Sequence, residues 1–152
     1  EGAAVAHVKP HGALYNMAAR DPALAAGVAA AVPDFDPRLV LYGLAGSALP
    51  AAGAARGLAV AHEAFCDRSY EANGSLSPRS LPGAVLEDPA AAAAQLLALV
   101  RDEALTARDG SRVAIRCDSV CLHGDRPDAA SYARHLRAVL AAAGVAVAPP
   151  RA

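Results

Sequence analysis

The sequence contains no tryptophan, few aromatic residues and a single lysine. Lysine and arginine together number 14 in 152 residues, and only Lys9 is a lysine. The composition is biased toward alanine, arginine, glycine and valine, so a freely exchangeable lysine would have become arginine. A compact ammonium, or an amine whose pKa burial can lower, is not replaceable by a guanidinium. Lys9 therefore predicts a functional site, and the alternative is that one lysine persists by chance.

The chain also lacks an excess of either charge. Its 14 basic and 15 acidic residues give a net charge of -1, which provides no electrostatic footprint for nucleic acid and no basic helix for a membrane surface. Every long apolar stretch is interrupted by proline, glycine or a charge, so none is expected to span a bilayer. We predict neither nucleic acid nor a membrane as a partner.

Cysteine is scarce as well. The three cysteines, Cys66, Cys117 and Cys121, are an odd number with a C-x3-C spacing, which fits neither a disulfide framework nor a zinc ribbon. We interpret them as reduced core thiols, which predicts a cytoplasmic protein. The sequence begins at Glu1 rather than Met, so it does not decide whether a targeting segment precedes this residue.

Short apolar runs alternate with helical patterns along the chain, which predicts an α/β fold with a parallel sheet. Strands are expected at 3–8, 38–43, 57–65, 112–116, 119–124 and 145–149, and helices at 13–21, from Asp21-Pro22, after Ser47, from Asp88-Pro89 to Asp109-Gly110, and from Asp128 to Gly144. No G-x-G-x-x-G follows the first strand, so a β/α barrel is favoured over a dinucleotide-binding fold. Closed barrels usually need about 250 residues. We therefore expect residues 1–152 to form one domain, either an open sheet or part of a larger barrel.

Titratable side chains gather where three expected strands end. His7 and Lys9 lie at the end of the first strand, Glu63 and Asp67 at the end of the third, and His123 and Asp125 at the end of a later one. In β/α barrels these strand ends form the active site. We expect Lys9, Glu63 and His123 to surround one pocket.

Two further segments carry candidate residues. The stretch 66–89 is too long for a plain connector, and Arg68 and Arg79 within it could clamp an anionic substrate, the alternative being a solvated loop. "GLAGSAL" at 43–49 runs from a strand into a helix. Backbone N–H groups near Gly46 and Ser47 could hold a carboxylate or phosphate, although a tight turn explains the segment equally well.

The sequence is also compatible with a metal site. His7, His11, His62 and His123, together with nearby carboxylates, could form a His/carboxylate site. No H-E-x-x-H or similar spacing is present, so the identity of any metal is unknown.

The chain resembles the LamB/YcsF family, whose members form one component of the prokaryotic ATP-dependent 5-oxoprolinase. The resemblance rests on "HVKPHGALYN" (7–16), "GLAGS" (43–47), "EAFCDRSYEANGSLSPRSLPGAV" (63–85) and "VCLHGD" (120–125). Cys66 stands where the family more often has alanine, and Asn73 where it more often has aspartate. Motifs of the "DLNCDLGE" and "ACGFHAGD" kind are absent. The resemblance implies a barrel of about seven strands, here incomplete and lacking the N-terminal strands.

The resemblance implies cleavage of 5-oxoproline to L-glutamate, coupled to hydrolysis of ATP as co-substrate, with two partner subunits and a possible homo-oligomer. Phosphorylation of the lactam oxygen would activate the resonance-stabilised amide. The expected catalytic residues are Lys9 for oxyanion or phosphoryl stabilisation, His11 or Glu63 as general base, and Asp67. The expected substrate-binding residues are His7, Gly46, Ser47, Arg68, Tyr70, Arg79, His123 and Asp125. Within these sets, Arg68 or Arg79 would hold the carboxylate, Asp67 and Tyr70 would order the 66–89 loop, and His123 with Asp125 would form an orienting pair or a metal site.

Two other functional classes are also compatible with the sequence. The chain also resembles the broad group of polysaccharide-deacetylase and glycosidase barrels, which would require a metal triad. It is alternatively a non-catalytic fragment or assembly subunit, whose unpaired strand edges would promote self-association.

Overall fold

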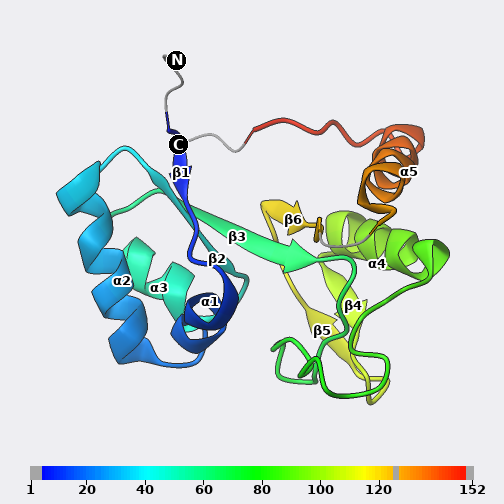
Figure 1. Ribbon diagram of the computed structural model, residues 1–152, viewed down its shortest axis with the longest axis horizontal. Coiled ribbons are helices and arrows are strands. Elements are labelled where there is room, and N and C mark those ends of the chain that lie inside the picture. The colour runs from blue at the N-terminus through cyan, green and yellow to red at the C-terminus, as the bar shows by residue number, and fades with distance from the viewer. Residues whose placement is uncertain (1–4, 125–126, 150–152) are drawn as a thin grey trace. The chain divides into compact units, whose positions relative to one another are not determined.

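The computed structural model describes residues 5–124 and 127–149 as an α/β fold (Figure 1). It divides the chain into two compact units, which we call the N-terminal unit, up to Glu63, and the C-terminal unit, from Ala64 to Pro149. Between them the described residues form these elements: β1 (His7–Val8), α1 (Gly12–Ala18), α2 (Pro22–Phe35), β2 (Val40–Leu44), α3 (Ala48–Ala55), β3 (Val60–Phe65), α4 (Pro89–Asp102), β4 (Ala104–Thr106), β5 (Arg112–Ala114), β6 (Ser119–Cys121) and α5 (Ala129–Ala142). The strand β3 begins in the first unit and ends in the second.

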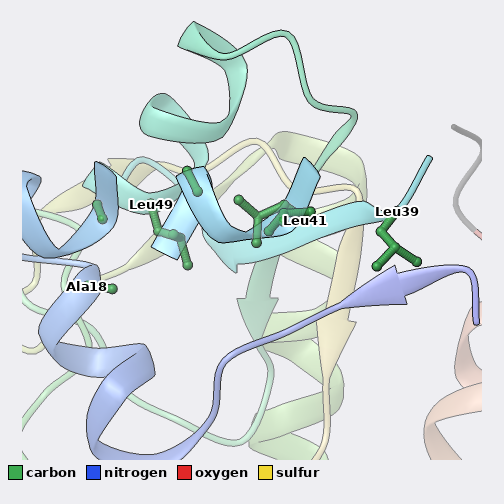
Figure 2. Packing of buried hydrophobic residues seen from close by; sticks show 7 residues of the cluster. Ala18, Leu39, Leu41 and Leu49 are labelled. Carbon is green, nitrogen blue, oxygen red and sulfur yellow. The ribbon is translucent and has the colours of Figure 1, made fainter. Parts of the chain in front are cut away.

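The N-terminal unit is a parallel sheet with three helices. β1 pairs with β2, and β2 pairs with β3, both in parallel. The buried residues that join α1, α2, β2 and α3 form one core, part of which Figure 2 shows: Ala18, Ala25, Ala29, Val32, Leu39, Leu41 and Leu49. The predicted parallel sheet is therefore confirmed for these three strands.

Local sequence signals explain where these helices begin. The Asp21 carboxylate accepts hydrogen bonds from the N–H groups of Ala23 and Leu24, and Pro22 occupies the first position of α2. Gly12 opens α1 with φ +60°, a value that favours glycine. At Gly43 a Cβ would lie 2.8 Å from Pro50 Cδ, so glycine allows α3 to pack closely on β2.

The C-terminal unit is built around α4 and α5. The two helices pack on the segment that follows β3, in a core that contains Cys66, Ala92, Leu96, Tyr132 and Leu136. Asp88 caps α4 as the sequence predicts, accepting hydrogen bonds from Ala90 N and Ala91 N. β6 follows β3 in the order of the main sheet, and β4 pairs with β5 in a separate two-stranded sheet.

Several predicted boundaries are wrong. The helix expected to reach Asp109-Gly110 ends at Asp102, because Glu103 takes the left-handed conformation (φ 47°) and its carbonyl accepts from Ile115 N. Leu105 then lies in β4, opposite Val113. The strand predicted at 112–116 is antiparallel to β4, not part of the parallel sheet.

Two predicted strands also differ at the ends of the described chain. Of the expected strand 3–8, residues 3 and 4 lie outside the described residues, and the described part forms a strand only at His7–Val8; residues 145–149 form no strand. Val147 is 54% exposed, and an extended segment without a hydrogen-bonded neighbour does not form a stable strand. Among the described residues, no helix has the length and apolar character needed to cross a membrane.

Candidate functional site

The single lysine forms a buried charge pair in the N-terminal unit. Lys9 Nζ donates to Glu63 Oε1 at 2.7 Å, and Tyr15 Oη donates to Glu63 Oε2 at 2.9 Å. The ammonium also lies 5.4 Å from the centroid of the Tyr15 ring, within range of a cation–π interaction. Both carboxylate oxygens of Glu63 are therefore engaged, by residues 54 and 48 positions away.

The strands and the first helix bring these three side chains together. Lys9 directly follows β1, Glu63 lies near the end of β3, and Tyr15 occupies the buried side of α1. Glu63 is in register with Leu44 on β2, and its carbonyl accepts from Ala45 N. The chain thus places charged groups at the C-terminal ends of parallel strands, as the sequence predicts.

The side chains of Lys9 and Glu63 differ in their exposure to solvent. The Lys9 side chain is 28% exposed and the Glu63 side chain only 4%. A ligand can therefore reach the ammonium more readily than the carboxylate. Because the buried carboxylate of Glu63 is fixed in position by the ammonium and the tyrosine hydroxyl, Glu63 is suited to orienting Lys9. The ammonium can stabilise negative charge on a bound oxyanion or phosphoryl group.

The other predicted residues of this unit lie outside that group. His7 is exposed and its ring lies 4.9 Å from that of Tyr42. His11 is exposed at the N-cap of α1. Their predicted roles in binding and as a general base stay predictions.

The 43–49 segment is a tight strand-to-helix turn. Gly46 has φ +73°, and Ser47 is the N-cap of α3 without a side-chain capping bond. The N–H groups of Ala45, Ser47 and Ala48 donate to backbone carbonyls. These amides are thus already used, which reduces the donors the segment can offer an anion. Anion binding at Gly46 and Ser47 stays a prediction.

The C-terminal unit contains an aspartate–histidine pair. His123 Nδ1 lies 2.7 Å from Asp67 Oδ2, and the His123 ring stacks on the Phe65 ring at 5.6 Å. Asp67 is 2% exposed, and its Oδ1 is buried with no hydrogen-bond partner among the described residues. The sequence predicts both residues but pairs His123 with Asp125, which lies outside the described residues. The predicted gathering of Lys9, Glu63 and His123 around one pocket stays a prediction.

The 66–89 loop is ordered by its own polar residues. Arg68 is 6% exposed, and it donates from Nε to Ala84 O at 3.1 Å and from Nη2 to Ser77 O at 2.6 Å. The fully buried Tyr70 accepts from Phe65 N at 2.8 Å through its hydroxyl oxygen. The role of Tyr70 in ordering this loop stays a prediction. Carboxylate binding by Arg68 or by the exposed Arg79 stays a prediction.

All three cysteines are free thiols, as predicted. Burial and the nearby charge of Asp67 raise the pKa of Cys66 to about 12, and burial raises the pKa of Cys117 to about 11. Since the thiolate is the nucleophile, these values argue against cysteine-based catalysis at either position.

We predict that Cys66 resists alkylation in the folded protein. With its pKa raised from 9.0 to about 12, the thiolate fraction at pH 8 falls about a thousandfold. Iodoacetamide labelling followed by peptide mass spectrometry should show an unmodified Cys66 in buffer and a fully modified one in guanidinium chloride. Rapid modification of Cys66 under native conditions would contradict this expectation.

A metal site is not evident in the described part of the chain. Within 5–124 and 127–149, no group of three or more histidine, cysteine, aspartate or glutamate side chains is placed to hold an ion. The metal triad that a deacetylase-like protein would require is therefore not seen in these residues.

Parallel strands whose C-terminal ends carry a lysine–glutamate pair define an α/β protein consistent with part of a β/α barrel. The chain belongs to the LamB/YcsF family, whose model matches residues 1–152. It is 54% identical over 147 residues to the 5-oxoprolinase A subunit of Methylococcus capsulatus, covering 97% of this chain and 56% of the relative. It is 52% identical to the 5-oxoprolinase A subunit of Geobacillus kaustophilus, covering 99% of this chain and 59% of the relative.

A solved structure agrees with this assignment. The crystal structure of a lactam utilization protein from Thermus thermophilus superposes with a TM-score of 0.87 and 44% identity, covering 96% of this chain and 58% of that one. The chain thus spans a little under three fifths of the length of these relatives.

Sequence reasoning missed two polar side chains. Tyr15 lies inside the first motif, and the signal for it was its position one helical turn beyond His11. Gln95 on α4 is the only glutamine in the chain, so the rarity argument that identifies Lys9 would also have identified it.

Proposed function

We propose that this chain functions as the A subunit of an ATP-dependent 5-oxoprolinase, which cleaves 5-oxoproline to L-glutamate in a complex with two other subunits. The observation that carries the proposal is the 52–54% identity, across nearly the whole chain, to proteins that bear this name. The single lysine of the chain, paired with a buried glutamate, supplies the chemistry that such a reaction needs. We place the protein in the cytoplasm, in keeping with its free thiols.

The proposed chemistry begins with the stability of the lactam. Transfer of the γ-phosphoryl group of ATP to the lactam oxygen releases ADP and makes the ring carbon electrophilic. Addition of water and cleavage of the ring C–N bond give an acyl phosphate. A second water then releases phosphate and leaves L-glutamate. The reaction therefore requires groups that stabilise negative charge on oxygen and groups that move protons to and from water and the ring nitrogen.

Lys9 fits the first requirement. Its side chain is partly exposed, and Glu63 and Tyr15 fix the position of the ammonium. It would stabilise the oxyanion or the phosphoryl group during transfer. The Asp67–His123 pair fits the second requirement, since an imidazole bound to a carboxylate through Nδ1 can exchange a proton at Nε2.

The proposal is tested by reconstitution. We expect glutamate release from 5-oxoproline only when ATP, this chain or a full-length version of it, and both partner subunits are present together. ADP formation should rise with 5-oxoproline concentration in the same mixtures. Equal glutamate release from the two partner subunits alone would overturn the proposal.

A further inference from the structure

The end of β3 and the residues after it form a buried run of main chain. Cys66, Asp67 and Arg68 follow the strand and are 1%, 2% and 6% exposed. A buried carbonyl left without a donor costs about 1–3 kcal/mol. Donors within the C-terminal unit contact all four carbonyls from Phe65 to Arg68.

One side chain contacts three of these carbonyls. Gln95 Nε2 lies 2.9 Å from Phe65 O, 2.7 Å from Arg68 O and 3.3 Å from Cys66 O. An amide nitrogen has two hydrogens, so the two short contacts are direct hydrogen bonds and the longer one is shared. The remaining carbonyl, that of Asp67, accepts from Leu86 N at 2.8 Å.

This arrangement fixes the backbone on both sides of Asp67. Its carboxylate then meets His123 at two points, Nδ1 at 2.7 Å and the backbone nitrogen at 3.4 Å, while the Phe65 ring stacks on the imidazole. An ionised carboxylate only accepts hydrogen bonds, so the proton of a neutral His123 must sit on Nδ1. Nε2 is then the basic nitrogen, and the His123 side chain is 27% exposed.

Packing alone does not explain a glutamine at this position. The residues of α4 that face the core are small or apolar, including Ala92, Leu96 and Val100. A leucine at position 95 would match that face and the helical propensity. A leucine there could not donate to the carbonyls of Phe65 and Arg68, whereas the glutamine amide does.

We propose that Gln95 is a positioning residue, which holds the turn Phe65–Arg68 so that Asp67 fixes the orientation and tautomer of His123. Its effect on turnover rests on the proposed function, whereas its effect on the imidazole does not. The two effects can therefore be measured separately.

The test is the ring tautomer of His123, read from its 15N shifts in the full chain labelled with 15N-histidine. The His123 signals are assigned from their loss in His123→Asn. At a pH where the ring is neutral, we expect the Nδ1-protonated form in the wild type and a severalfold loss of that form in Gln95→Met. Asp67→Ala should show the same loss.

In the assembled enzyme, Gln95→Met should lower kcat about tenfold and leave KM unchanged, because Gln95 acts through His123.

The control is Val100→Ala, which weakens the packing of the same helix but keeps the Gln95 amide, and which should keep the wild-type tautomer. If Gln95→Met does not fold, the isosteric Gln95→Glu, whose carboxylate cannot donate, should show the same loss of tautomer. The wild type provides a third measure, since the Gln95 side-chain amide protons should exchange slowly with solvent. A wild-type tautomer in a folded Gln95 variant, an equal loss in Val100→Ala, or fast exchange of the Gln95 amide would each overturn the proposal. Absence of wild-type turnover would count against the proposed function alone.

Discussion

Replacing Lys9 by methionine is expected to reduce 5-oxoproline-dependent glutamate release by about 100- to 1000-fold, the loss typical of removing one charge-stabilising group from a site. Lys9→Arg should lose nearly as much activity. Glu63 and Tyr15 hold a compact ammonium at 2.7 and 5.4 Å, and a planar guanidinium cannot place its charge at the same point. The measurement is steady-state turnover in the assembled complex.

Two companion variants separate charge from packing. Glu63→Gln keeps the shape of the buried side chain but removes its charge, so it should lower kcat through misplacement of the ammonium. Arg56→Lys, at an exposed position in the same unit, should leave activity unchanged. Full activity of Lys9→Arg would show that the rarity of lysine in this chain is accidental.

The second large effect is on stability. Arg68→Met is expected to lower the free energy of unfolding by about 3 kcal/mol, because the carbonyls of Ser77 and Ala84 lose a charged donor in a buried setting. Arg68→Lys should lose an intermediate amount, since one ammonium cannot reproduce the two directed bonds of the guanidinium. Urea unfolding followed by circular dichroism measures both.

The matched control is Arg79→Met, an exposed arginine of the same loop. We expect it to cost much less stability than Arg68→Met. If Arg68→Met instead unfolded at the wild-type urea concentration and only weakened 5-oxoproline binding, the predicted substrate-binding role would replace the structural one.

The parts of the fold that the sequence predicts well are those with a local physical signal. Asp21-Pro22 and Asp88-Pro89 each predict a helix start, and both aspartates cap as expected. The end of α4 was missed because Leu105 continues the helical spacing, while the left-handed turn at Glu103 depends on a bond from Ile115. An antiparallel pairing between residues 104–106 and 112–114 leaves no periodicity that distinguishes it from a parallel strand.

In the candidate site, too, the residues with a local sequence signal were predicted and the contacts between distant residues were not. Residue rarity and strand-end position identified Lys9, Glu63, Asp67 and His123 from the sequence. Their partners depend on three-dimensional contacts that span 48 to 56 positions, so the pairing of His123 with Asp67 rather than a near neighbour was not predictable. Arg68 looks like a ligand for anions in the sequence because nothing there reveals that carbonyls of its own loop accept its bonds.

The way in which the end of β3 is anchored also bears on how this segment can evolve. Its main chain is fixed by donors from α4 and the 66–89 loop, and the Cys66 side chain fills an apolar core position. Position 66 can therefore drift between small uncharged residues without moving its neighbours. We therefore expect Asp67 to keep its place when another small uncharged residue occupies position 66.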